Sequence, residues 1–74
     1  MSEEAGRIEA KILKVLSAIP RGVLYSTTDW GRILNEDKRE IRKTLDALEA
    51  EGRIEVVRSE EGRPDKPLYK LKNA

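Results

Sequence analysis

Apolar residues in the first part of the chain recur at the spacing of one helical face. They fall at Ala5, Ile8, Ile12, Val15, Leu16 and Ile19. This spacing places the side chains on a single stripe, so it predicts a helix over about residues 3–19 that packs against a core. Pro20 and Gly22 follow and favour the end of that helix.

A short strand and a second helix are predicted next. The run VLY over residues 23–25 has β-like composition and is long enough only for a small strand. In the following STTD, Ser26 stands three residues before Asp29, which is typical of a helix N-cap. We therefore expect a short helix over about residues 27–34.

A third helix is predicted over about residues 37–51. Asn35 and Asp37, in the turn LNED, are both good capping residues. The apolar stripe of this helix comprises Ile41, Leu45 and Leu48. Gly52 stands where a left-handed residue commonly ends a helix, so the helix should stop there.

Two strands should follow, over about residues 54–58 and 68–72, and pair as an antiparallel hairpin. The connection EGRPDKP contains Pro64 and Pro67, which lack N–H groups and suit a stiff exposed loop better than a central strand. Together these elements predict one α+β domain, with a trihelical core and a small sheet made of the short strand and the hairpin.

The three large aromatic side chains divide by position. Trp30 shares one face of the second helix with Ile33 and Leu34, which favours a place in the core over a stacking role. Tyr69 is predicted to point inward from its strand, with Lys70 outward. The sequence does not decide the place of Tyr25.

Composition argues against several classes of function. The 74 residues include no cysteine and no histidine, which excludes disulfides and the usual zinc sites. The same absence leaves no catalytic triad, and the chain has no glycine-rich phosphate loop or calcium loop. We therefore expect no enzyme activity, no cofactor and no small-molecule ligand.

The chain has no apolar segment near the roughly 18 residues that a membrane-spanning helix needs, and its acidic start is unlike a signal peptide. These features predict an intracellular, cytoplasmic protein. The high Lys, Arg and Glu content, without cysteine, is similar to that of proteins from hot environments. The formal net charge of +1 gives by itself no case for nucleic acid.

The order of helix, small strand, helix, tight turn, helix and hairpin resembles the winged helix-turn-helix family. The segments that carry the resemblance are STTDWGRIL, NED, KREIRKTLDALEAEGRI and VVRSEEGRPDKPLYKL. The resemblance implies a small transcriptional regulator that binds double-stranded DNA in a sequence-specific way. It implies a third helix in the major groove and a wing, over residues 59–67, on the backbone or in the minor groove.

The residues of the third helix are compatible with that role. At 3.6 residues per turn, Arg39 and Lys43 lie opposite the apolar stripe and Arg42 lies on its flank. Because arginine can bind guanine through two hydrogen bonds, Arg39 and Arg42 are the candidates for base contacts and Lys43 for phosphate. Further candidates for DNA contact are Thr27, Thr28 and Lys38, with Arg63 and Lys66 on the wing.

Other interpretations stay open. A solvated face would show the same cations, and the acids Glu60, Glu61 and Asp65 in the predicted wing would repel phosphate. The near-neutral, mixed-sign surface also fits a winged helix that binds a protein in a multi-subunit assembly. A homodimer is a further possibility, although the first helix offers few apolar positions on its outer side apart from Leu13.

Overall fold

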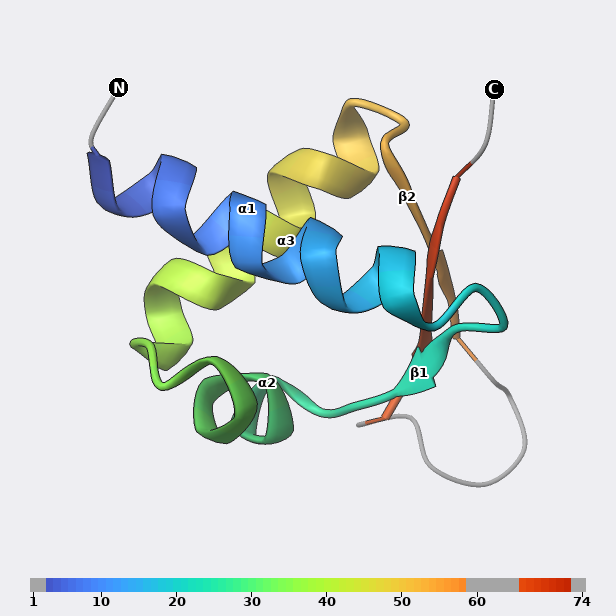
Figure 1. The fold of residues 1–74 in the computed structure, drawn as a ribbon, viewed down its shortest axis with the longest axis horizontal. Coiled ribbons are helices and arrows are strands. Elements are labelled where there is room, and N and C mark those ends of the chain that lie inside the picture. The colour runs from blue at the N-terminus through green and yellow to red at the C-terminus, as the bar shows by residue number, and fades with distance from the viewer. Residues whose placement is uncertain (1–2, 59–65, 73–74) are drawn as a thin grey trace.

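The computed structural model describes residues 3–58 and 66–72 of the 74-residue chain. The elements, in order, are α1 (Glu3–Ala18), β1 (Val23–Leu24), α2 (Thr27–Leu34), α3 (Lys38–Ala50), β2 (Ile54–Val57) and β3 (Leu68–Leu71). Figure 1 shows α1 lying across α3, with the strands gathered at one side of the helices. The predicted α+β class is confirmed.

The sheet is antiparallel, and its strand order is β1-β3-β2. Tyr69 on the central strand β3 pairs with Val23 on one side and with Val56 on the other. Paired residues point to the same face of a sheet, so this row faces the helices together. Tyr69 is accordingly buried, and its predicted inward direction is confirmed.

All three helices and all three strands contribute to one core. Its buried residues are Ile8, Ile12, Leu16, Val23, Trp30, Leu34, Ile41, Leu45, Leu48, Ile54 and Tyr69. Trp30 has no exposed surface, and its ring meets Tyr25 at 5.0 Å and Tyr69 at 5.7 Å, both edge to face. Trp30 is therefore the centre of the aromatic packing, as its helical position predicts, and Tyr25 is half-buried against it.

Capping side chains fix the starts of α2 and α3. Ser26 accepts a hydrogen bond from the backbone N–H of Asp29, while the Asp29 carboxylate accepts one from the N–H of Ser26. Asp37 caps α3 by accepting from the N–H groups of Arg39 and Glu40. Asn35 ends α2 in the left-handed region at φ 55°. Asn35 and Asp37 therefore set the direction in which α3 leaves the α2–α3 turn.

The exit from α3 has the hydrogen bonds of a Schellman motif. The N–H of Gly52 bonds to the carbonyl of Glu49 at 3.0 Å, and that of Arg53 bonds to the carbonyl of Leu48 at 2.9 Å. Gly52 has φ +73°, a conformation that side chains with a Cβ rarely adopt. This glycine turns the chain directly from α3 into β2.

Gly22, just before β1, also has a positive φ that favours glycine. Its φ is +96°, and a Cβ placed on it would lie 2.9 Å from the carbonyl oxygen of Tyr69. No side chain fits so close to a backbone atom, so glycine at this position lets β1 pair tightly with β3.

Part of the predicted loop lies outside the described residues, and this includes Gly62, Arg63 and Pro64. Within the described ranges, no helix has the length and apolar character needed to cross a membrane.

Candidate functional site

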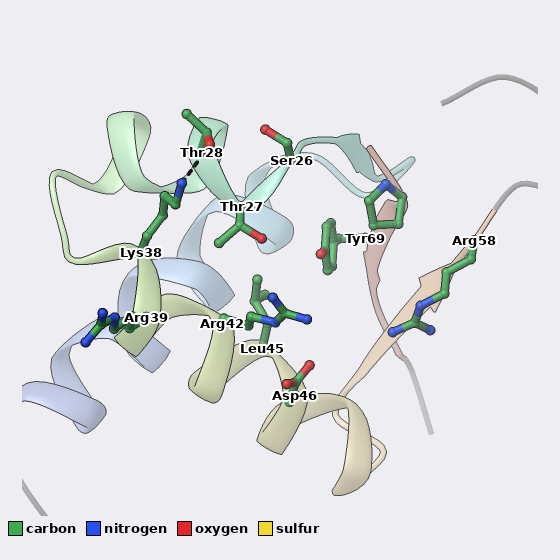
Figure 2. A pocket seen from close by; sticks show the side chains of 11 residues that line it. Ser26, Thr27, Thr28, Lys38, Arg39, Arg42, Leu45, Asp46, Arg58 and Tyr69 are labelled. Atoms are coloured by element: carbon green, nitrogen blue, oxygen red, sulfur yellow. Dashed lines mark hydrogen bonds between the residues drawn. The ribbon is translucent and has the colours of Figure 1, made fainter. Parts of the chain in front are cut away.

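A hollow of about 550 Å³ lies between α2, α3 and the β2–β3 pair. The residues that line it are Ser26, Thr27, Thr28, Lys38, Arg39, Arg42, Leu45, Asp46, Arg58, Pro67 and Tyr69. Figure 2 shows these side chains around the open space, with α2 above, α3 below and the strands to one side. The lining therefore combines cations and hydroxyl groups over an aromatic and aliphatic floor.

The α3 helix supplies most of the charge. Ile41, Thr44, Leu45 and Leu48 are its buried residues, and Arg39 and Arg42 are exposed. Neither arginine forms a hydrogen bond or ion pair through its side chain within the part of the chain that the structure describes. In Figure 2, Arg42 extends into the hollow and Arg39 points outward at its margin. Both guanidinium groups are thus accessible to an external partner.

The start of α2 supplies hydroxyl groups. The Thr27 hydroxyl faces the hollow in Figure 2. Lys38 reaches across from α3 and donates to the Thr28 hydroxyl at 3.4 Å. Since Ser26 is occupied by its capping contact with Asp29, Thr27 and Thr28 are the hydroxyls best placed to meet a ligand.

Two ion pairs border the hollow. The Arg58 guanidinium donates two hydrogen bonds to the Glu49 carboxylate, both at 3.0 Å. The pair lowers the pKa of Glu49 and raises that of Arg58. Lys66 lies 3.2 Å from Asp29, whose pKa is lowered first by the Ser26 backbone N–H and then by Lys66. These pairs attach the β2–β3 region to α3 and α2.

Not every predicted contact residue lies in the hollow. Lys43 is absent from its lining and stands 3.7 Å from Glu40, on the other flank of α3. Lys66 is held by Asp29 beside the hollow, and Arg63 lies outside the described residues. The structure therefore gathers Thr27, Thr28, Lys38, Arg39 and Arg42 from the predicted set.

Sequence reasoning missed Arg58 and Asp46. Arg58 follows β2 and continues the alternation of Ile54 and Val56, which face the helices. That alternation could have placed its side chain beside α3. Asp46 lies four residues after Arg42, and residues at this spacing lie on the same side of a helix, so the sequence could have placed the two side chains together.

Tyr69 forms part of the floor of the hollow and is 7 % exposed. Burial raises the pKa of its phenol above the ordinary value of 10.0. The phenol therefore stays protonated near neutral pH and can donate a hydrogen bond but cannot act as a base.

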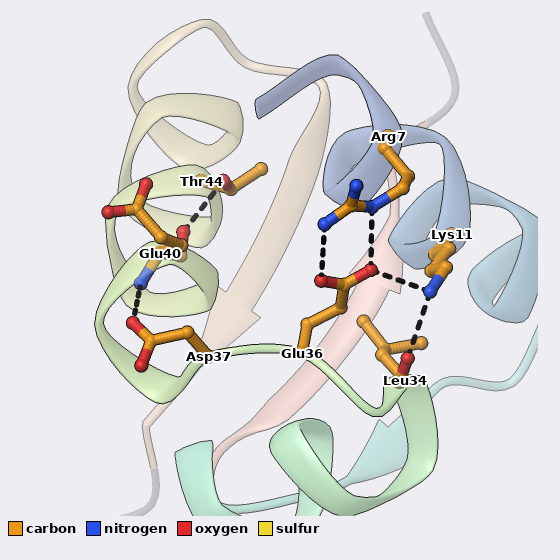
Figure 3. Close-up of polar contacts among 7 residues, drawn as sticks. All are labelled: Arg7, Lys11, Leu34, Glu36, Asp37, Glu40 and Thr44. Atoms are coloured by element: carbon orange, nitrogen blue, oxygen red, sulfur yellow. Dashed lines mark hydrogen bonds and ion pairs between the residues drawn. The ribbon is translucent and has the colours of Figure 1, made fainter. Parts of the chain in front are cut away.

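A second charged cluster, formed by Glu36, Arg7 and Lys11, joins the α2–α3 turn to α1, and we call it the Glu36 cluster (Figure 3). Glu36 accepts two hydrogen bonds from Arg7, at 2.9 and 2.8 Å, and one from Lys11 at 2.6 Å. Lys11 also donates to the carbonyl of Leu34 at 3.0 Å. Arg7 and then Lys11 lower the pKa of Glu36 from 4.5 to about 2. This carboxylate is a structural anion and no proton acceptor near neutral pH.

Among the described residues, no three Asp, Glu, His or Cys side chains lie close enough together to hold a metal ion. Glu49 and Asp29, which stand beside the hollow, are instead paired with Arg58 and Lys66.

Comparisons with protein-family models, with curated proteins and with solved structures give no significant match.

Proposed function

We propose that this protein is a winged helix domain that binds double-stranded DNA, with α3 in the major groove and the β2–β3 hairpin as the wing. The observation that supports this most is the pair Arg39 and Arg42, exposed on the hollow side of α3 and without an ion pair among the described residues. An unpaired guanidinium at an open surface can bind phosphate or the guanine edge without first losing a partner.

The shape of this surface supports the same function. With 13 residues, α3 is about 20 Å long, and a B-DNA major groove about 12 Å wide admits one helix. Lys38, Arg39 and Arg42 all lie in the first half of α3. The helix dipole adds partial positive charge at that end. We therefore expect α3 to enter the groove with its N-terminal end leading.

The surroundings of α3 supply backbone contacts. Lys38 with the hydroxyls of Thr27 and Thr28 forms a polar edge on one side of the hollow, and Arg58 stands on the other. Such groups bind phosphate and fix the register of a helix on DNA. On this basis the protein is a sequence-specific regulator of transcription, with base contacts from Arg39 and Arg42.

Titration of duplex DNA at several salt concentrations tests this function. For about four phosphate contacts, a plot of log K against log salt has a slope of roughly −3.6. Arg42→Gln is expected to lower the affinity for duplex DNA at every salt concentration. The control Arg21→Gln removes the same charge from an exposed position outside the hollow and should change that affinity little. Absence of binding at low salt, or equal losses in the two variants, would reject the proposal.

A second candidate function is contact with another protein through the outer face of the sheet. Leu68 pairs with Leu24 on one side and Val57 on the other, so the three form one row on that face. Leu24 is 63 % exposed and Val57 is 44 % exposed. A second copy of the chain would bury this apolar row. Sedimentation over a range of concentrations tests it: self-association that Leu24→Lys abolishes would support it, and a monomer throughout would oppose it.

A further inference from the structure

Among the described residues that line the hollow, Asp46 is the one carboxylate. The neighbouring acids Asp29 and Glu49 are neutralised by Lys66 and Arg58. Asp46, in contrast, is exposed and forms no hydrogen bond or ion pair within residues 3–58 and 66–72. Figure 2 shows its carboxylate on the same side of α3 as Arg42. A negative group thus stands in the surface that we propose for DNA.

An anion at such a place is unfavourable unless it meets a hydrogen-bond donor, because phosphates repel it. The donors in the major groove are the N4 amino group of cytosine and the N6 amino group of adenine. Adenine presents its N7 acceptor beside N6, and the second oxygen of a carboxylate would face that lone pair. Cytosine has no acceptor beside N4 on this edge, so a carboxylate fits cytosine better.

We propose that Asp46 is a specificity-determining residue that accepts a hydrogen bond from cytosine N4, while Arg42 donates to O6 and N7 of a guanine nearby. This inference rests on the proposed function. Four residues of helix separate the two side chains, a distance of about 6 Å. Base pairs are spaced about 3.4 Å apart, so the cytosine and the guanine lie within about two base pairs of each other.

The hydrogen-bonding chemistry of an aspartate at position 46 can be tested by substitution. Asn at position 46 would keep the size but change the chemistry: its amide donates to adenine N7 and accepts from adenine N6. Ala would remove the contact. Because Asp46 is exposed on α3 and caps no helix end, neither change removes a contact of the core.

Selection of bound sequences from random duplexes, repeated with the wild-type chain and its Asp46 variants, tests the inference. The wild-type chain is expected to select a cytosine within about two base pairs of the Arg42 guanine. For Asp46→Asn, the preferred base at that position should become adenine, with an affinity roughly five-fold or more above that for cytosine. For Asp46→Ala, the position should show no base preference. The guanine preference persists in both variants.

A matched control separates base recognition from simple charge. Glu55→Gln removes one negative charge from an exposed position on β2 outside the hollow and is expected to leave the selected sequence unchanged. If the Asp46 variants bind all sequences more tightly but select the same bases as the wild-type chain, the carboxylate only repels phosphate and the inference is wrong. If the wild-type chain selects no duplex and binds none at low salt, the proposed function fails together with it.

Discussion

The Glu36 cluster joins α1 to the α2–α3 turn, whereas the hollow lies between α2, α3 and the β2–β3 pair, and the two use charge in different ways. In the Glu36 cluster, a carboxylate whose side chain is 7 % exposed is held by both Arg7 and Lys11. In the hollow, Arg39 and Arg42 form no ion pair among the described residues, although Asp46 lines the same hollow and Glu49 and Asp29 stand close by with other partners.

The charged groups of the Glu36 cluster maintain the fold, whereas the exposed arginines of the hollow are open to a ligand. Arg7 and Lys11 come from α1 and connect it, through Glu36, to the turn that sets the direction of α3. Removing such a contact should disturb the fold. Removing Arg39 or Arg42 should leave the fold intact and change only what the surface binds. The following predictions sharpen this contrast, from the largest effect to the smallest.

Glu36→Ala is expected to lower the midpoint of thermal unfolding by several degrees. The change deletes three charge-assisted hydrogen bonds that join α1 to the α2–α3 turn. Circular dichroism during heating measures the effect, with Glu55→Gln as an exposed control. An unchanged midpoint would mean that the cluster does not hold α1 against the turn.

Acid should weaken the fold through the same carboxylate. The pKa of Glu36 is about 2 in the folded chain and 4.5 in its ordinary state. Since the unfolded chain takes up the proton first, this contribution to stability is complete above about pH 4.5 and is lost as pH falls towards 2. Denaturant titrations at several pH values measure it. In Glu36→Gln this part of the acid dependence should become smaller, and identical pH curves would contradict the assignment.

Glu49→Gln tests what the ion pair between Glu49 and Arg58 contributes to stability and to DNA affinity. The pair with Arg58 is largely exposed, so its loss should change the free energy of unfolding by no more than about 1 kcal/mol. It also removes a negative charge and releases Arg58, so duplex affinity should rise a few-fold at low salt. A fall in duplex affinity would show instead that the pair must hold Arg58 in place for binding.

Lys43→Gln should have the smallest effect. The pattern of α3 places Lys43 among the DNA contacts, but its side chain lies on the Glu40 flank, outside the hollow. We expect duplex affinity to stay within about two-fold of wild type, since only long-range attraction is lost. A loss as large as that of Arg42→Gln would mean that DNA covers the Glu40 flank as well.

Local patterns in the sequence predict much of the fold. The apolar stripes of α1 and α3, the capping residues Ser26 and Asp37, and the left-handed Gly52 all act within a few residues of their own position. For this reason the sequence predicts the helices and their ends. The burial of Trp30 follows from the same periodicity.

The contacts of the candidate site depend on the tertiary structure. Arg7 and Glu36 are 29 residues apart, and nothing local indicates that they meet. Arg58 and Glu49 meet because the turn at Gly52 folds β2 back beside α3. The sequence also places Lys43 with Arg39, because both lie opposite the apolar stripe. Only the positions of α2 and of the strands decide which flank of α3 borders the hollow.

The central claim is that the hollow, and no other face, contacts duplex DNA. Titration of the ¹⁵N-labelled protein with a selected duplex, followed residue by residue in amide NMR spectra, tests it most directly. The account predicts the largest shifts at Thr27, Arg39, Arg42 and Arg58, with Arg7, Lys11 and Glu36 nearly unchanged. Shifts centred on Leu24, Val57 and Leu68, or on the Glu36 cluster, would contradict it.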